Sequence, residues 1–112
     1  MLSKKFRLQR KEIEDLKSSH KEIVQGKYFG LIYQKNLGER KFALIISNKI
    51  SKKATIRNKI KRLFYKALTK ELLDFEGKFL FLAKKNCLVA SLGEFEKEIE
   101  NFKNFVKRDS GK

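Results

Sequence analysis

The spacing of apolar residues predicts helices at the two ends of the chain. Between Gln9 and Ser19, "QRKEIEDLKSS" places Ile13 and Leu16 three residues apart among charges, which is typical of a short amphipathic helix with a thin apolar stripe. Near the other end, Ser91 and Glu94 form an S-x-x-E capping box. Four apolar residues follow at intervals of four, three and four, which is one helix face: Phe95, Ile99, Phe102 and Val106.

Aromatic and β-branched runs predict strands in the middle of the chain. These runs are "KYFGLIYQ" from Lys27, "KFALIIS" from Lys41 to Ser47, and "KFLFLA" from Lys78 to Ala83. The turn sequence "KNLGER" between the first two predicts that they form a hairpin. Because the runs are apolar at both odd and even positions, we expect both faces of the sheet to be covered.

A third helix is predicted between the second and third strands, within "ISKKATIRNKIKRLFYKAL" (Ile50 to Leu68). Thr55 is a suitable N-cap, and six apolar residues then recur at helical spacing for the core: Ile56, Ile60, Leu63, Phe64, Ala67 and Leu68. The order of helix, strands, helix, strand and helix indicates an α+β fold, with a small sheet and helices packed on it.

Composition limits the chain to a single folded domain over residues 1–112, since 41% of its residues are hydrophobic and ten are Phe. Cys87 is the only cysteine, which excludes an intramolecular disulfide and a cysteine-based zinc site. The chain has no apolar run of 18 residues, and its start lacks the apolar core of a signal peptide. We therefore expect a cytoplasmic protein.

Charge is the strongest global feature: 28 Lys and Arg against 13 Asp and Glu give a formal net charge of +15. Between Glu39 and Glu71 there is no acidic residue, while eleven cations occur there: Arg40, Lys41, Lys49, Lys52, Lys53, Arg57, Lys59, Lys61, Arg62, Lys66 and Lys70. So dense a field favours a polyanionic partner. Nucleic acid fits better than a membrane surface, because neither terminus is a basic helix with a broad apolar stripe.

The cations of the third helix point to phosphate binding. Like charges three and four residues apart disfavour a helix in isolation, so an external anion should compensate them. Lys61 supplies a point charge, Arg57 a planar fork, and Asn58 an amide that donates and accepts hydrogen bonds. We expect the side chains of Arg57 and Lys61 to be exposed. The alternative is a solvated basic face that only aids solubility, but such faces usually mix signs, as "KEIEDLK" does elsewhere in this chain.

The segment "RNKIKRL", Arg57 to Leu63, resembles the signature of the bacterial ribonuclease P protein subunit, Arg-Asn-Arg followed by Ile-Lys-Arg-Leu. Upstream, "SNKISKKATI" resembles the basic loop of the family and "FRLQRKEI" its opening segment; the likeness ends before a polar tail from about residue 107. Lys59 stands where the motif has its second Arg, and Asn48 where a basic residue is usual. The resemblance implies a mixed four-stranded sheet with three helices in α-β-β-β-α-β-α order and a left-handed β-α-β crossover. The extra strand would lie in "EIVQG", before Lys27.

The resemblance also implies a function: a catalytic RNA with bound Mg²⁺ removes the 5′ leader of precursor tRNA, and the protein assists binding without a catalytic residue of its own. The implied partners are this RNA and precursor tRNA, with no membrane and no stable protein partner. Carried onto this chain, the RNA-binding residues are Lys49, Lys52, Lys53, Arg57, Asn58, Lys59, Lys61, Arg62 and Lys66.

In the family, a cleft between the first helix and the sheet holds the single-stranded leader, with aromatic side chains on which bases stack. Here the first helix offers Ile13 and Leu16, and Phe29 or Tyr33 on the first long strand would supply the aromatic group. Tyr65 stands where a cation facing the leader is expected.

Three other functions remain possible from the sequence. A structural RNA-binding protein of ribosomal type would need the same charge but not the ordered motif. A protein nuclease acting alone would need a catalytic or metal cluster, whereas His20 is the sole histidine and Asp74 with Glu76 forms only a short acidic patch. A DNA-binding helix-turn-helix would need a second helix joined to the basic helix by a short turn.

Overall fold

The predicted α+β fold is confirmed by a computed structural model that describes residues 6–19, 23–35, 38–47, 49–71 and 76–110. Its helices are α1 (Arg10–Ser19), α2 (Ala54–Glu71) and α3 (Leu92–Ser110), with a short 3-10 helix, η2 (Lys85–Val89). Its strands are β1 (Val24–Gln25), β2 (Phe29–Gln34), β3 (Arg40–Ile45) and β4 (Gly77–Ala83). The short β1 lies within the segment proposed for the extra strand.

The four strands form one mixed sheet in the order β1-β2-β4-β3. β2 pairs antiparallel with both β1 and β4, whereas β3 and β4 are parallel. The chain therefore crosses from β3 to β4 through α2, as the family resemblance implies. The left-handed sense of this crossover stays a prediction from the resemblance.

The predicted hairpin between β2 and β3 is wrong, because β4 lies between them and pairs with each. The turn sequence reverses the chain at Gly38, which has φ +84°, but a reversal alone does not make two strands neighbours.

Gly77 begins β4 with φ +142°, and a Cβ there would lie 2.7 Å from the Gln34 carbonyl oxygen. β4 is also the most apolar strand, and a central position keeps Phe79, Leu80 and Phe81 fully buried.

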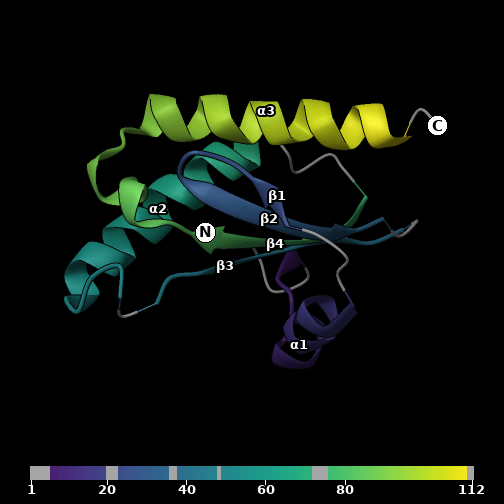
Figure 1. The fold of residues 1–112 in the computed structure, drawn as a ribbon, viewed down its shortest axis with the longest axis horizontal. Helices are drawn as coiled ribbons and strands as arrows, with labels where there is room; N and C mark the ends of the chain where they lie inside the picture. The colour runs from purple at the N-terminus through teal and green to yellow at the C-terminus, as the bar shows by residue number, and fades with distance from the viewer. Residues whose placement is uncertain (1–5, 20–22, 36–37, 48, 72–75, 111–112) are drawn as a thin grey trace.

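Helices cover the sheet on both faces, as the pattern predicts (Figure 1). α2 and α3 lie on one face, and their core includes Phe29, Phe42 and Phe81 from alternate strand positions. α1 lies on the opposite face, where Leu16 packs with a smaller cluster that includes Ile32 and Leu80. We call this second side of the sheet the α1 face.

The capping box of α3 is confirmed: the Glu94 backbone N–H donates to Ser91 Oγ at 3.3 Å, and the Ser91 N–H donates to Glu94 Oε1 at 3.1 Å. All four residues of the predicted apolar face are buried: Phe95, Ile99, Phe102 and Val106. The helix continues to Ser110, so the first four residues of the predicted polar tail are polar but helical.

Two details of the prediction for α2 are wrong. The helix begins at Ala54, so Thr55 lies inside its first turn and is not the N-cap. Ile56 is 36% exposed, because the first turn of α2 extends past the core, while Ile60, Phe64 and Leu68 are buried as predicted.

Glu98 of α3 fastens the chain between β1 and β2. Glu98 is 7% exposed, and its carboxylate accepts hydrogen bonds from the backbone N–H groups of Lys27, Tyr28 and Phe29. Gly26 makes this approach possible, because a Cβ there would lie 2.8 Å from the Glu98 carboxyl carbon. A buried carboxylate with three donors is fully satisfied, so it ties α3 to the sheet.

Candidate nucleic-acid interface

The basic loop between β3 and α2 is held by its own backbone and by Arg57. The Ile50 N–H donates to the Ser47 carbonyl at 3.0 Å, and Ile50 packs half-buried against the core. Arg57 Nη1 donates to the Ser51 carbonyl at 2.7 Å. With these anchors the loop's three predicted RNA-binding lysines are all exposed: Lys49, Lys52 and Lys53.

α2 presents its predicted cations and amide to solvent on the side away from the core. The exposed residues are Asn58, Lys59, Lys61, Arg62 and Lys66. Arg57 is half-buried, so the expectation that it is exposed is wrong; its guanidinium holds the loop instead. No acidic residue stands in the first turn of α2. Near the far end of the helix, Lys70 Nζ lies 3.5 Å from Glu96 Oε2 of α3.

A hollow of about 380 Å³ opens on this helix, lined by Arg62, Tyr65, Lys66 and Thr69. Burial raises the pKa of the Tyr65 phenol, against the opposing effects of a hydrogen bond with the Leu44 backbone and the charge of Arg7. Tyr65 is thus directed toward the edge of the sheet at β3. Two cations beside an aromatic ring and a hydroxyl suit a phosphate and its nucleoside.

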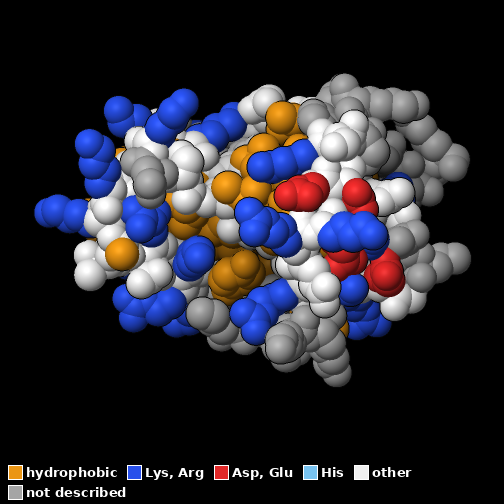
Figure 2. All heavy atoms as spheres, turned by 90° about the horizontal axis from the view of Figure 1, so that it is seen from below, with side chains coloured by type: hydrophobic (Ala, Val, Ile, Leu, Met, Phe, Trp, Pro, Cys, Tyr) orange, Lys and Arg blue, Asp and Glu red, His pale blue; other side chains and the backbone are white. Residues whose placement is uncertain are grey.

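The α1 face carries an apolar strip that α1 leaves partly uncovered. The strip consists of the half-buried side chains around the smaller core cluster: Ile13, Ile23, Ile45 and Leu82. Figure 2 shows apolar side chains in the middle of this face. Lys and Arg lie around them and are densest at one end, while the acidic groups lie toward the other end, where Lys and Arg are also present. A surface with half-buried apolar groups and adjacent cations matches the needs of single-stranded RNA, which offers bases and phosphates together.

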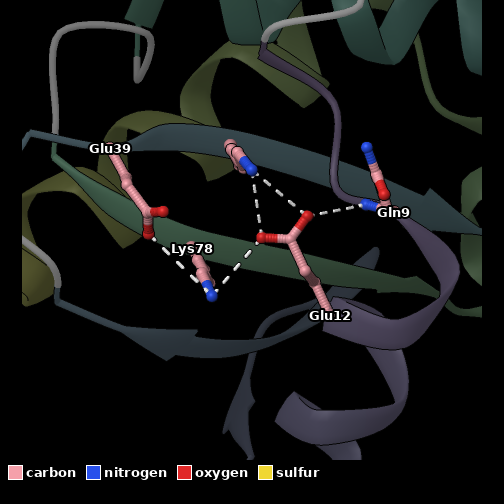
Figure 3. A network of polar contacts seen from close by, with 5 residues as sticks. Gln9, Glu12, Glu39 and Lys78 are labelled. Atoms are coloured by element: carbon pink, nitrogen blue, oxygen red, sulfur yellow. Dashed lines mark hydrogen bonds and ion pairs between the residues drawn. The ribbon is translucent and has the colours of Figure 1, made fainter.

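Glu12 fixes α1 to the sheet through a polar network (Figure 3). Its carboxylate accepts from the Gln9 N–H at 3.1 Å and from Lys41 Nζ at 3.1 Å, and Lys78 Nζ lies 3.4 Å away. Lys78 also lies 3.9 Å from Glu39. Burial raises the pKa of Glu12, but the Gln9 hydrogen bond and the two ammonium groups outweigh it and leave that pKa below its usual value.

The two aromatic residues of β2 proposed for the leader cleft, Phe29 and Tyr33, do not lie on the α1 face. Phe29 is fully buried between the sheet and the α2–α3 layer, so its assignment as a base platform is wrong. Tyr33 packs on the same core, stacked on Phe79 at 5.9 Å, which is the face away from α1. Leu16 is 2% exposed and serves the core, whereas Ile13 is half-buried in the apolar strip.

Residues that the sequence reasoning missed complete this face: Lys41 and Ile45 on β3, and Lys78 and Leu82 on β4. The signal was present, because each pair lies four residues apart on a strand and so projects to one side. The structure does not describe Asn48, His20 or Asp74, so the predictions for these residues lie outside the described part of the chain.

A family model for ribonuclease P matches residues 2–107. The chain belongs to the ribonuclease P protein family. This membership makes it an RNase P protein subunit, an RNA-binding protein of tRNA processing whose partner in the ribonucleoprotein is an RNA.

Solved structures of RNase P proteins share the fold at low sequence identity. A Staphylococcus aureus RNase P protein mutant with defective mRNA degradation activity has a TM-score of 0.78 and 15% identity, with 91% of this chain and 88% of that chain covered. The Thermotoga maritima RNase P protein has a TM-score of 0.74 and 18% identity, covering 86% and 93%. No curated protein matches the sequence. In the part of the chain that the structure describes, no helix is long and apolar enough to cross a membrane.

Proposed function

We propose that this RNase P protein subunit binds the catalytic RNA through α2 and the basic loop, and holds the 5′ leader of precursor tRNA on the α1 face. In this way it assists the Mg²⁺-dependent endonucleolytic removal of the leader, which yields the mature 5′ end of the tRNA. The RNA performs the chemical step.

The observation that carries the proposal is the one-signed surface of α2 and its loop beside the apolar strip. Eight of the nine predicted RNA-binding residues are exposed there, and the ninth, Arg57, holds the loop. Lysines and arginines bind phosphates of any sequence, and apolar side chains pack against bases of any sequence. Such a surface suits leaders that differ between tRNAs.

Mg²⁺ is assigned to the RNA in this proposal. Among the described residues, no group of three or more His, Cys, Asp or Glu side chains is arranged to hold a metal ion. Glu12 and Glu39 are instead engaged by lysines. The protein's contribution is positive charge, which lowers the repulsion between RNA phosphates and so reduces the Mg²⁺ concentration that the reaction needs.

The proposal is tested by measuring cleavage of a precursor tRNA by the catalytic RNA of ribonuclease P. The reaction is run at limiting Mg²⁺, with and without this protein. We expect the protein to stimulate cleavage, and the double variant Lys61→Gln with Arg62→Gln to lose most of that stimulation. Lys97→Gln with Lys107→Gln removes the same charge from exposed positions on α3 and should stimulate like the wild type. Tight RNA binding without any stimulation would favour the alternative, a structural RNA-binding protein.

A further inference from the structure

Two lysines stand side by side on the α1 face, at the end of the sheet away from the basic loop. Lys41 of β3 and Lys78 of β4 are direct partners in the parallel register, and both contact the carboxylate of Glu12. Adjacent ammonium groups repel each other, so this pair requires an anion between them. In the free protein the anion is Glu12, with the Gln9 N–H as a third donor.

This cluster can be reached from solvent. The side chains of Lys41, Lys78 and Glu12 are 27%, 21% and 17% exposed. A hollow of about 340 Å³ opens beside Lys41, and its lining also includes Phe6, Gly38, Glu39 and Arg40. Lys41 and Ile45 lie on the same side of β3, four residues or roughly 13 Å apart, so an RNA strand over the apolar strip can extend to the lysine pair.

The carboxylate and an RNA phosphate are interchangeable at this position. A phosphodiester carries one negative charge over two free oxygens, as a carboxylate does, and so satisfies the same ammonium groups. The attachment of α1 is also slight: Leu16 is its one fully buried apolar side chain among the described residues, with Ile13 half-buried. Release of Glu12 would therefore not dismantle the main core.

We propose that Lys41 and Lys78 form a phosphate subsite for the leader. In the free protein the Glu12 carboxylate occupies this subsite, and on binding an RNA phosphate replaces the carboxylate. This rests on the proposed function, in which the α1 face holds the leader. Glu12 is then an internal competitor that the RNA must displace.

The test is binding of a fluorescein-labelled single-stranded RNA of about eight nucleotides to the full chain, followed by anisotropy. Glu12→Gln should bind the RNA about three- to tenfold more tightly than Glu14→Gln at low salt, because only the first frees the lysine pair. Glu14 is the matched control: it lies on α1, is exposed and pairs with Arg10 at 3.9 Å, and its substitution changes the net charge equally. Equal or weaker binding by a folded Glu12→Gln variant would overturn the proposal.

A measurement on the wild type removes any dependence on how the variants fold. Carboxyl ¹³C NMR should show the pKa of Glu12 rising toward its usual value when the RNA oligonucleotide is bound, because Lys41 and Lys78 then face phosphate. An unchanged Glu12 pKa in the RNA complex would overturn the proposal. This carboxylate faces Lys41 and Lys78, and Glu39 lies beyond Lys78.

The failure of this inference differs from the failure of the proposed function. If the wild type does not bind the oligonucleotide at all, the assignment of the leader to the α1 face is wrong, and the subsite with it. If the wild type binds and Glu12→Gln behaves like Glu14→Gln, the leader assignment stands and the lysine pair is not part of it.

Discussion

At the scale of single residues, two glycines and one glutamate decide how the sheet is assembled. Gly77 lets β4 begin beside the end of β2, and Gly26 lets Glu98 of α3 approach the backbone before β2. Neither role could be read from the sequence, because isolated glycines predict a turn or a bulge but not which distant backbone approaches them. The wrong hairpin between β2 and β3 follows from this gap.

Gly77→Ala should destabilise the protein by about 1–3 kcal/mol, since it places a Cβ at positive φ and 2.7 Å from the Gln34 carbonyl oxygen. Urea unfolding at neutral pH measures this. Gly93→Ala is the control: it lies in the first turn of α3, and its Cβ would meet only Ser91 Oγ at 3.9 Å. The control should be neutral or slightly stabilising, and equal losses in the two variants would contradict the account.

Glu98→Gln should lower the free energy of unfolding by about 1–3 kcal/mol, because an amide provides one good acceptor where three backbone N–H groups converge. Glu100→Gln removes the same charge from an exposed position on the same helix and should change stability little. Thermal or urea unfolding of both variants compares them directly. A loss shared by both would mean that charge, and not the buried contact, is responsible.

At the scale of elements, the helices were predicted more accurately than the way they dock. The capping box and spacing of α3 fix its start and its buried face from local sequence alone. α1 has too thin an apolar stripe to explain its attachment, and the lysines that bind Glu12 come from β3 and β4, more than 25 residues away in the sequence. The aromatic residues of β2 were assigned to the wrong face because that strand is apolar on both.

The docking of α1 should weaken in acid. The pKa of Glu12 is lower in the folded protein than its usual value, so its stabilisation is present above the unfolded-state pKa and is lost as pH falls through the folded one. Glu12→Gln should therefore cost about 1–2 kcal/mol of unfolding free energy at pH 7. The difference from the wild type should shrink as pH falls through the folded-state pKa of Glu12. A cost that is independent of pH would contradict the ionic contribution.

At the scale of the whole molecule, positive charge is distributed unevenly. This uneven distribution is a stronger argument for RNA binding than the net charge of +15. The sequence correctly predicted that most cations of the basic loop and of α2 are exposed to solvent, because an amphipathic helix buries its apolar face and leaves its cations outside. It also predicted that Arg57 is exposed, whereas the fold half-buries Arg57 and uses its guanidinium to hold the Ser51 carbonyl. Predicting this contact requires the path of the loop, which the sequence does not reveal.

The most direct test of the central claim is the salt dependence of RNA binding, compared between two double variants of equal charge. If five to eight phosphates are neutralised, the wild-type log–log slope should be about −4 to −7. Arg62→Gln with Lys66→Gln should weaken binding and make the slope less steep by about 1 per cation removed, because both side chains are exposed on α2. Lys97→Gln with Lys107→Gln should keep the wild-type slope. Equal effects of the two variants, or a wild-type slope near zero, would contradict the claim that the α2 surface binds RNA by its charge.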